Sequence, residues 1–313
     1  MMLARVADSL YWVGRYLERA EHLSRVSTVM LNATLDRADL ATQAAQIALA
    51  ALGDAEPGRV VAPVDSARAL VLDRDREGSV VVSLSRAREN ARQVRDQITT
   101  EVWERLNLLY LHVTDAKAKR VFNADAPGFL LDKIADLHLV MGAADATMSH
   151  GEGWRFMVAG VHIERAQLIA RLLKVPFMKG PAPALDDHLV LVSLLRMACA
   201  LEPYLREYTA DVTARHILEF LLFNEDFPRS IRFCTARIEE HLTHLSRGRE
   251  GHSGEPLRLA GRLNARLAYT VVADVEGAGA GALLTTVETE CAAINRALYD
   301  TFVTYPLESR LPV

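Results

Sequence analysis

Apolar residues recur at intervals of three and four along almost the whole chain. This spacing lines the apolar side chains along one face of a helix. The first such series is Leu3, Val6, Leu10, Val13, Leu17 and Ala20, and a longer one is Leu84, Ala87, Ala91, Val94, Ile98, Val102 and Leu109. One strand-like run, GSVVVSL at residues 78–84, has no second strand to pair with. We therefore interpret it as the lead-in to a helix that is capped near Ser83 or Ser85.

The same pattern predicts about ten helices. We expect them at residues 3–20, 38–52, 84–109, 129–149, 154–174, 185–201, 203–223, 228–246, 257–275 and 282–304. Segments rich in glycine and proline predict exposed connections at residues 54–63, 175–183 and 248–254. Because most connections are short, the sequence predicts an all-α fold, a multi-helix antiparallel bundle.

A twelve-residue frame occurs twice in the chain. GRYLERAEHLSR (Gly14–Arg25) returns 146 residues later as GVHIERAQLIAR (Gly160–Arg171), with five identical positions. The bare dipeptide also occurs at Glu104-Arg105 in unrelated surroundings, so only the longer frame carries weight. We interpret the chain as a single domain, 1–313, with two related halves, 1–150 and 151–313. The alternative is a coincidence of helical patterning.

Composition excludes several classes of protein. The formal net charge of −4 lacks the basic footprint of a nucleic-acid-binding domain. The longest apolar stretch, residues 189–201, is interrupted by Arg196 and is too short to span a bilayer, so we expect no membrane association. The beginning of the chain carries Arg5 and Asp8 where a secretion signal would need an apolar core. Three cysteines without CxxC spacing indicate reduced core residues of a cytoplasmic protein.

The first copy of the repeated frame places charged side chains on an apolar helix. Arg15, Glu18, His22 and Arg25 share one face. Since the surroundings are apolar, we expect Glu18 to be partly buried and to need a partner. That partner is not Arg19, because adjacent side chains on a helix point about 100° apart.

If the two copies pack about a pseudo-twofold axis, Glu18 meets Arg165 while Arg19 meets Glu164. This pairing would make the charges a structural feature of the interface. The alternative is a polar site, in which the two glutamates act as acid and base and the two arginines bind a carboxylate or phosphate. A site for a polar ligand or a peptide terminus is a third interpretation.

Three further groups are candidate site residues. Arg88, Glu89 and Asn90 could join an anion site or form a solvated charged face. Trp154 and Arg155 precede the second copy of the frame and would lie in the core and at its rim. Arg229 and Ser230 follow an acidic lead-in and a proline, which also indicate the start of a helix.

Metal and nucleotide motifs are missing from the sequence. No Glu-x-x-His occurs, and Glu240 with His244 has no matching second set, so we expect no metal. The glycine-rich segment 277–281 follows no predicted strand, and no GxxxxGK[ST] motif exists, so we expect no bound cofactor.

Four sequence blocks resemble the bacterial alpha-E domain family, and the resemblance covers nearly the whole chain. The blocks are LARVADSLYWVGRYLERAEH, SLSRARENARQVRDQITTEVWERLNLLY, GEGWRFMVAGVHIERA and FNEDFPRSIRFCTARIEEHL. One departure stands out. Where the first copy has Arg15-Tyr16, the second has Val161-His162, although the family usually repeats a basic and an aromatic residue there.

The resemblance implies an all-helical protein that works in a larger system. Family members are encoded beside, or fused to, unusual ATP-grasp amide ligases, often near transglutaminase-like and proteasome-like peptidases. We therefore expect an accessory or scaffold subunit of a peptide-ligase system, which binds the ligase or a peptide substrate. The alternatives are an independent enzyme acting on peptide or amino-acid conjugates and a small-ligand sensor. The sequence indicates no particular oligomeric state.

Overall fold

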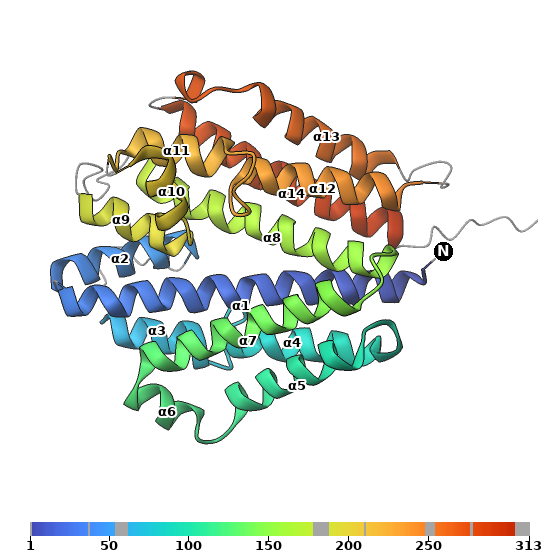
Figure 1. Ribbon diagram of the computed structural model, residues 1–313, viewed down its shortest axis with the longest axis horizontal. Coiled ribbons are helices and arrows are strands. Elements are labelled where there is room, and N and C mark those ends of the chain that lie inside the picture. The colour runs from blue at the N-terminus through green and yellow to red at the C-terminus, as the bar shows by residue number, and fades with distance from the viewer. Residues whose placement is uncertain are drawn as a thin grey trace, which may run out of the picture.

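The computed structural model describes residues 2–36, 38–53, 62–177, 188–209, 211–247, 254–275 and 278–303. This part of the chain contains fourteen α-helices, two short 3-10 helices and no strand, which confirms the all-α prediction (Figure 1). The α-helices are α1 (Ala4–Asp36), α2 (Ala38–Ala51), α3 (Pro63–Leu72), α4 (Val80–Gln93), α5 (Thr100–Thr114), α6 (Ala118–Ala124), α7 (Ala126–Thr147), α8 (Glu152–Phe177), α9 (His188–Met197), α10 (Leu201–Tyr208), α11 (Ala214–Phe223), α12 (Ile231–Leu245), α13 (Gly254–Tyr269) and α14 (Ala278–Phe302).

Two four-helix units make up most of the fold. In the first unit α1 packs against α4 and α7, and α5 closes the ring; in the second α8 packs against α12 and α14, and α13 closes the ring. Neighbouring helices within a unit are antiparallel. On α8 and α14, for example, Phe156 contacts Phe302, while Arg171 near the other end of α8 pairs with Glu288. The expected antiparallel bundle is therefore present twice.

Helices α1 and α8 join the two units and lie side by side at the centre of the molecule (Figure 1). They run parallel to each other. The backbone N–H of Met2 donates to Glu152 (2.8 Å) at the first end, and Arg19 donates to Glu164 (2.7 Å) further along both helices. Equivalent positions of the repeated frame therefore lie alongside each other, as a duplication about a pseudo-twofold axis would place them.

The glycine that opens each copy of the frame allows this close packing. A Cβ atom on Gly14 would lie 1.9 Å from the carbonyl oxygen of Met157, and one on Gly160 would lie 2.2 Å from that of Tyr11. Both distances are far inside van der Waals contact, and the obstructing atoms belong to the backbone. The two helices can therefore approach this closely only because both positions are glycine.

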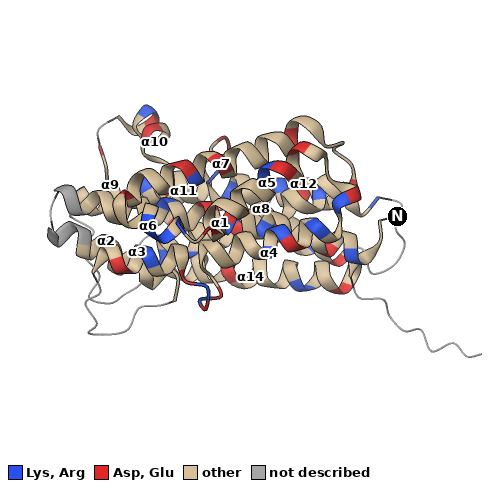
Figure 2. Ribbon diagram, turned by 90° about the horizontal axis from the view of Figure 1, so that it is seen from below, with Lys and Arg blue, Asp and Glu red and all other residues tan. Residues whose placement is uncertain are grey.

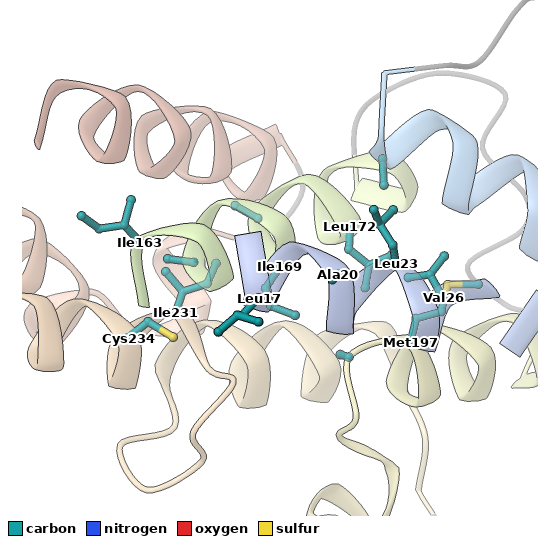
Figure 3. Packing of buried hydrophobic residues seen from close by; sticks show 14 of the residues in the cluster. Leu17, Ala20, Leu23, Val26, Ile163, Ile169, Leu172, Met197, Ile231 and Cys234 are labelled. Atoms are coloured by element: carbon teal, nitrogen blue, oxygen red, sulfur yellow. The ribbon is translucent and has the colours of Figure 1, made fainter. Parts of the chain in front are cut away.

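Apolar side chains fill the spaces around the central helix pair. Leu17 and Leu23 from α1 pack with Ile169 from α8 and Ile231 from α12 in one continuous cluster (Figure 3). All four are almost completely buried. Burial of an aliphatic side chain of this size contributes about 1.5 to 3 kcal/mol to folding, so the cluster is a main source of stability.

The predicted helix 84–109 is wrong in its bounds, because the structure divides it into α4 and α5. The cap expected at Ser83 or Ser85 is also wrong. Ser79 caps α4, and its hydroxyl accepts a hydrogen bond from the backbone of Val82 (3.3 Å). Thr99 caps α5 in the same way, which starts a new helix without any glycine or proline before it.

The predicted helix 203–223 is likewise two helices, α10 and α11. Thr209 ends the first with φ of +57°, and Thr213 caps the second. Helices α3 and α6 were not predicted from the sequence. The helix expected from Pro228 begins at Ile231. These differences raise the number from the ten predicted helices to fourteen.

The three predicted connections fall largely outside the described residues. Residues 54–61, 178–187 and 248–253 are not among the described residues. Val175 to Phe177 continue α8, and Gly254 begins α13.

Cys234 and Cys291 are buried and Cys199 is half-buried, all three with free thiols. None of the described helices is long and apolar enough to cross a membrane. Basic and acidic residues are interspersed over the helices in Figure 2.

Candidate functional site

The two copies of the Glu-Arg pair bind each other across the α1–α8 interface. Arg165 donates through Nε and Nη2 to the two carboxylate oxygens of Glu18 (2.8 and 2.6 Å). Arg19 donates through Nε to Glu164 (2.7 Å). The reciprocal pairing expected from the repeat is confirmed, and each arginine binds the glutamate of the other copy.

Each glutamate also binds a second arginine. Arg15 on α1 donates to Glu164 (2.7 Å), and Arg229 donates to Glu18 (3.1 Å). Arg229 lies in the connection before α12, and it supplies the charge that the second copy lacks, since Val161 occupies the position equivalent to Arg15. The departure from the repeat is therefore compensated by a residue from another element.

The two second arginines make equivalent bridges. Arg15 joins Glu164 to Gln167 (2.8 Å), and Arg229 joins Glu18 to Glu21. Gln167 and Glu21 both stand seven positions after the glycine of their copy. Glu21, which was not among the predicted site residues, also binds Arg25 (2.5 Å) and His138 (3.1 Å). The sequence feature that could have identified Glu21 is its equivalence to Gln167 in the repeated frame.

Burial and charge together fix the ionisation of this network. Glu18 and Glu164 are only 4% and 3% exposed. Burial alone would raise the pKa of Glu164, but Arg15 and Arg19 hold that pKa below its ordinary value. Burial opposes the charged form of Arg165, yet Glu18 raises its pKa above the ordinary value. Glu164 and Arg165 therefore stay charged at neutral pH.

Arginine exceeds glutamate in the network. Five guanidinium groups, from Arg15, Arg19, Arg25, Arg165 and Arg229, surround the carboxylates of Glu18, Glu21 and Glu164. Arg19, Arg25 and Arg165 are partly exposed, whereas the three carboxylates are buried. The excess positive charge therefore lies toward the solvent-facing edge of the interface.

A compact turn before α12 holds Arg229 against α1. Ser230 caps α12, accepting a hydrogen bond from the backbone of Phe233 (3.0 Å), and its hydroxyl donates to the carbonyl of Asn224. The Asn224 side chain accepts from the backbone N–H groups of residues 226 and 227 (2.9 and 2.7 Å). Arg165 donates to the carbonyl of Pro228 (3.1 Å). Ser230 thus positions Arg229 and takes no part in the ion pairs itself.

The same turn precedes α4 in the first unit. There Ser79 caps the helix and donates to the carbonyl of Asp73 (2.5 Å), and the Asp73 side chain accepts from the backbone of Asp75 (2.9 Å). Gly78 stands where the second unit has Arg229. The two units therefore share a second structural correspondence, and only one of them carries an arginine in this turn.

The structure does not bring Arg88, Glu89 and Asn90 to the network. Arg88 donates to Asn107 on α5 (3.1 Å) and lies over two aromatic rings of that helix. Glu89 pairs with Arg92 on the surface (2.7 Å). Of this group, Arg88 serves the packing of α4 on α5, and Glu89 belongs to a solvated face.

Trp154 and Arg155 belong to a separate cluster between α8 and α12. Trp154 stacks on His150 (3.8 Å between ring centroids) and meets the edge of His241 (5.5 Å), while Arg155 approaches His241 (3.4 Å). The neighbouring His162 is buried, and its Nδ1 has no hydrogen-bond partner in the described part of the chain. Burial, reinforced by the positive charge of Arg165, holds the pKa of His162 well below its ordinary value.

An open cavity of about 330 Å³ lies beside the network, between α1, α8 and α14. Its walls include Tyr11, Trp12, Phe156 and Phe302, and its polar groups include Asn295. The carboxamide oxygen of Asn295 accepts from Tyr11 (2.6 Å) and from Arg15 (2.8 Å), so one wall of the cavity is bonded directly to the network. No sequence motif indicated this site.

Among the described residues, no group of three or more His, Cys, Asp or Glu could hold a metal ion.

The amino-acid sequence matches a known family over most of its length. Residues 2–303 match a family described as a predicted alpha-helical domain with a conserved ER motif. The chain is also similar to an uncharacterized protein of Mycobacterium bovis and to uncharacterized proteins of two strains of Mycobacterium tuberculosis. Each is 27% identical over an alignment of 323 positions, which covers 95% of this chain and 36% of the relative. The chain thus spans about a third of the length of these curated relatives. No solved structure matches it.

Proposed function

The chain belongs to the Alpha-E family, and from that premise we propose that it is an accessory or scaffold subunit of an ATP-grasp amide- or peptide-ligase system. In this role it binds the ligase or a peptide substrate. The ligase partner comes from the resemblance, because family members are encoded beside such ligases or fused to them. The cytoplasm is the corresponding compartment, which the free thiols of the three cysteines also favour.

One observation carries the choice of a binding role over catalysis. Glu18 and Glu164, the two carboxylates that a catalytic interpretation would use, are buried and each is bound by two arginines. A general acid or base must reach its substrate and exchange a proton near the working pH. Carboxylates held this way favour a structural function for the Glu-Arg pairs, while the neighbouring cavity offers space for a ligand.

The length of the relatives supports the same proposal. The matched region covers 36% of the first mycobacterial relative, so its counterpart there is one part of a longer polypeptide. A module that works by binding is suited to such a context, since it can act on whatever the remainder of the polypeptide or a separate partner supplies.

Co-purification and rate measurements with the ligase encoded nearest to this chain test the proposal. We expect the two proteins to elute together in size-exclusion chromatography, and we expect the ligase to turn over faster when the chain is present. The surface variant Glu89→Gln, which leaves the network intact, serves as a control for both readouts. If the chain neither binds the ligase nor changes its rate, the proposal fails. Turnover of a peptide conjugate by the isolated chain would support the independent enzyme instead.

A further inference from the structure

The cavity beside the network combines a half-buried carboxylate with aromatic walls. Asp8 on α1 lines it together with Tyr11, Trp12, Phe156 and Phe302. No described lysine or arginine forms an ion pair with Asp8. Burial raises the pKa of its carboxyl group, and a hydrogen bond from the Trp12 side chain acts in the opposite direction. A carboxylate in such surroundings gains from a cation, and aromatic faces add to the attraction.

The opposite wall offers a hydrogen-bond donor. The atom of Asn295 that faces Arg15 must be the carboxamide oxygen, because a guanidinium group can only donate. The amide nitrogen Nδ2 therefore points away from the network, and it has no acceptor among the described residues. Arg296, next in sequence and exposed, lies at the same cavity and forms no ion pair in the described part of the chain.

Size and lining restrict the ligand further. A volume of about 330 Å³ is at the lower end of the range for small-molecule sites, which suits one or two amino-acid residues. Phe156, Leu298 and Phe302 make the inner wall apolar, so the buried part of the ligand must be apolar as well.

We propose that this cavity binds an α-amino acid unit that carries a free ammonium group and an apolar or aromatic side chain. The ammonium group pairs with Asp8, the carbonyl oxygen accepts from Asn295 Nδ2, and the side chain packs against Phe156 and Phe302. A free amino acid and the first residue of a peptide share this chemistry. The assignment deepens the proposed function and rests on it for the biological origin of the ligand.

Isothermal titration calorimetry with the full chain tests the site directly. The ligands are L-leucine, L-leucine amide and the dipeptide Leu-Ala, and the matched ligand without a charged amine is N-acetyl-leucine amide. We expect saturable binding of ligands with a free ammonium group and at least about tenfold weaker binding of the acetylated one, because acetylation removes the positive charge that pairs with Asp8. The order of affinity among the three amines then identifies a free amino acid or a peptide terminus as the source.

Two variants and one control locate the binding. Asp8→Asn should weaken the amines by about tenfold or more, whereas Asp300→Asn, an exposed position on α14 outside the cavity, should not. Ala292→Trp places a large side chain at an exposed helical position on the cavity wall and should abolish binding without touching Asp8. This second variant decides the question if Asp8→Asn does not fold.

Absence of binding up to millimolar concentration overturns the inference. So does binding that survives Ala292→Trp, or that accepts the acetylated ligand equally well. These results leave the association with the ligase intact, whereas loss of that association with intact binding of amines contradicts the scaffold role alone.

Discussion

Gly14 and Gly160 occupy reciprocal positions, because each lies against the carbonyl oxygen of the residue three positions before the other. The obstructing atoms belong to Met157 and Tyr11, and neither backbone can move without separating α1 from α8. Close approach of the backbones is what brings the Glu-Arg pairs within hydrogen-bonding distance. The glycines and the charges of the repeated frame therefore form one structural device.

Adding a methyl group at either glycine should destabilise the fold. We expect Gly14→Ala and Gly160→Ala each to lower the free energy of unfolding by about 1 to 3 kcal/mol, the usual range for overpacking. Gly142→Ala on α7 is the control, since a Cβ there meets nothing within 4 Å. It should raise stability by about 0.5 to 1 kcal/mol through helix propensity. Urea unfolding followed by circular dichroism measures all three, and equal effects would contradict the close-packing account.

Removing one carboxylate from the network should leave its positive charge less well compensated. Glu18→Gln takes away the carboxylate that pairs with Arg165 and one of the two that pair with Arg229, so we expect a loss of about 3 to 5 kcal/mol in the free energy of unfolding. Glu89→Gln breaks a surface pair with Arg92 and should leave the melting temperature unchanged. If Glu18→Gln melts like the parent protein yet no longer binds the ligase, the pair is functional and the structural interpretation is wrong.

Arg229 should not tolerate replacement by lysine. Its guanidinium group bridges Glu18 and Glu21 through two separate nitrogen atoms. Lysine has a single ammonium nitrogen and lacks this forked geometry, so it cannot reproduce both contacts. We expect Arg229→Lys to destabilise the protein by about 1 to 3 kcal/mol. Arg232→Lys, three residues further on and paired with the exposed Glu225, should change stability far less. Differential scanning calorimetry on the two variants provides the comparison.

Stability should fall as the pH drops below about 6.5, in part because of His22. Burial, together with the positive charge of Arg229, lowers the pKa of His22 to about 4 from an ordinary value of 6.5. Between these two pH values the His22 side chain is protonated in the unfolded chain and neutral in the folded protein. The contribution of His22 to the free energy of unfolding is complete above pH 6.5. It falls by about 3 kcal/mol as the pH drops toward 4.

Urea titrations at several pH values isolate this contribution. The variant His22→Gln should show a shallower decline between pH 6.5 and 4 than the parent protein. His188→Gln, at the exposed start of α9, should follow the parent protein. Parallel curves for His22→Gln and the parent would rule out the assignment.

The sequence allowed the ion pairs to be predicted because the repeated frame fixes their register. Equivalent positions must meet if the copies pack symmetrically, and neighbours on a helix cannot pair with each other. Arg229 could not be assigned to Glu18 in the same way. Val161 revealed that a charge was missing, but the donor depends on how the turn before α12 folds, which no local pattern records.

Helix ends and the cavity were harder to predict for a related reason. The apolar spacing continues through residues 94–99, so only the capping threonine Thr99 marked the start of a new helix. Asp8 and Asn295 lie in helices at opposite ends of the chain; Asp8 falls within the first family block, where nothing indicated a cavity, and Asn295 lies in none of the four blocks. Their shared cavity follows from the packing of α14 against α8 and α1, which depends on the complete bundle.

The parallel course of α1 and α8 also has an electrostatic consequence. Each helix carries a dipole with its positive end at the N-terminus, so two parallel neighbours set like partial charges side by side and repel, whereas antiparallel neighbours attract. Glu152, in the first turn of α8 and bonded to the Met2 backbone, brings a negative charge to this shared positive end. The backbone dipoles therefore work against the central helix pair, and its attraction must come from side chains, both the apolar ones that pack around it and the crossed glutamates and arginines at its middle.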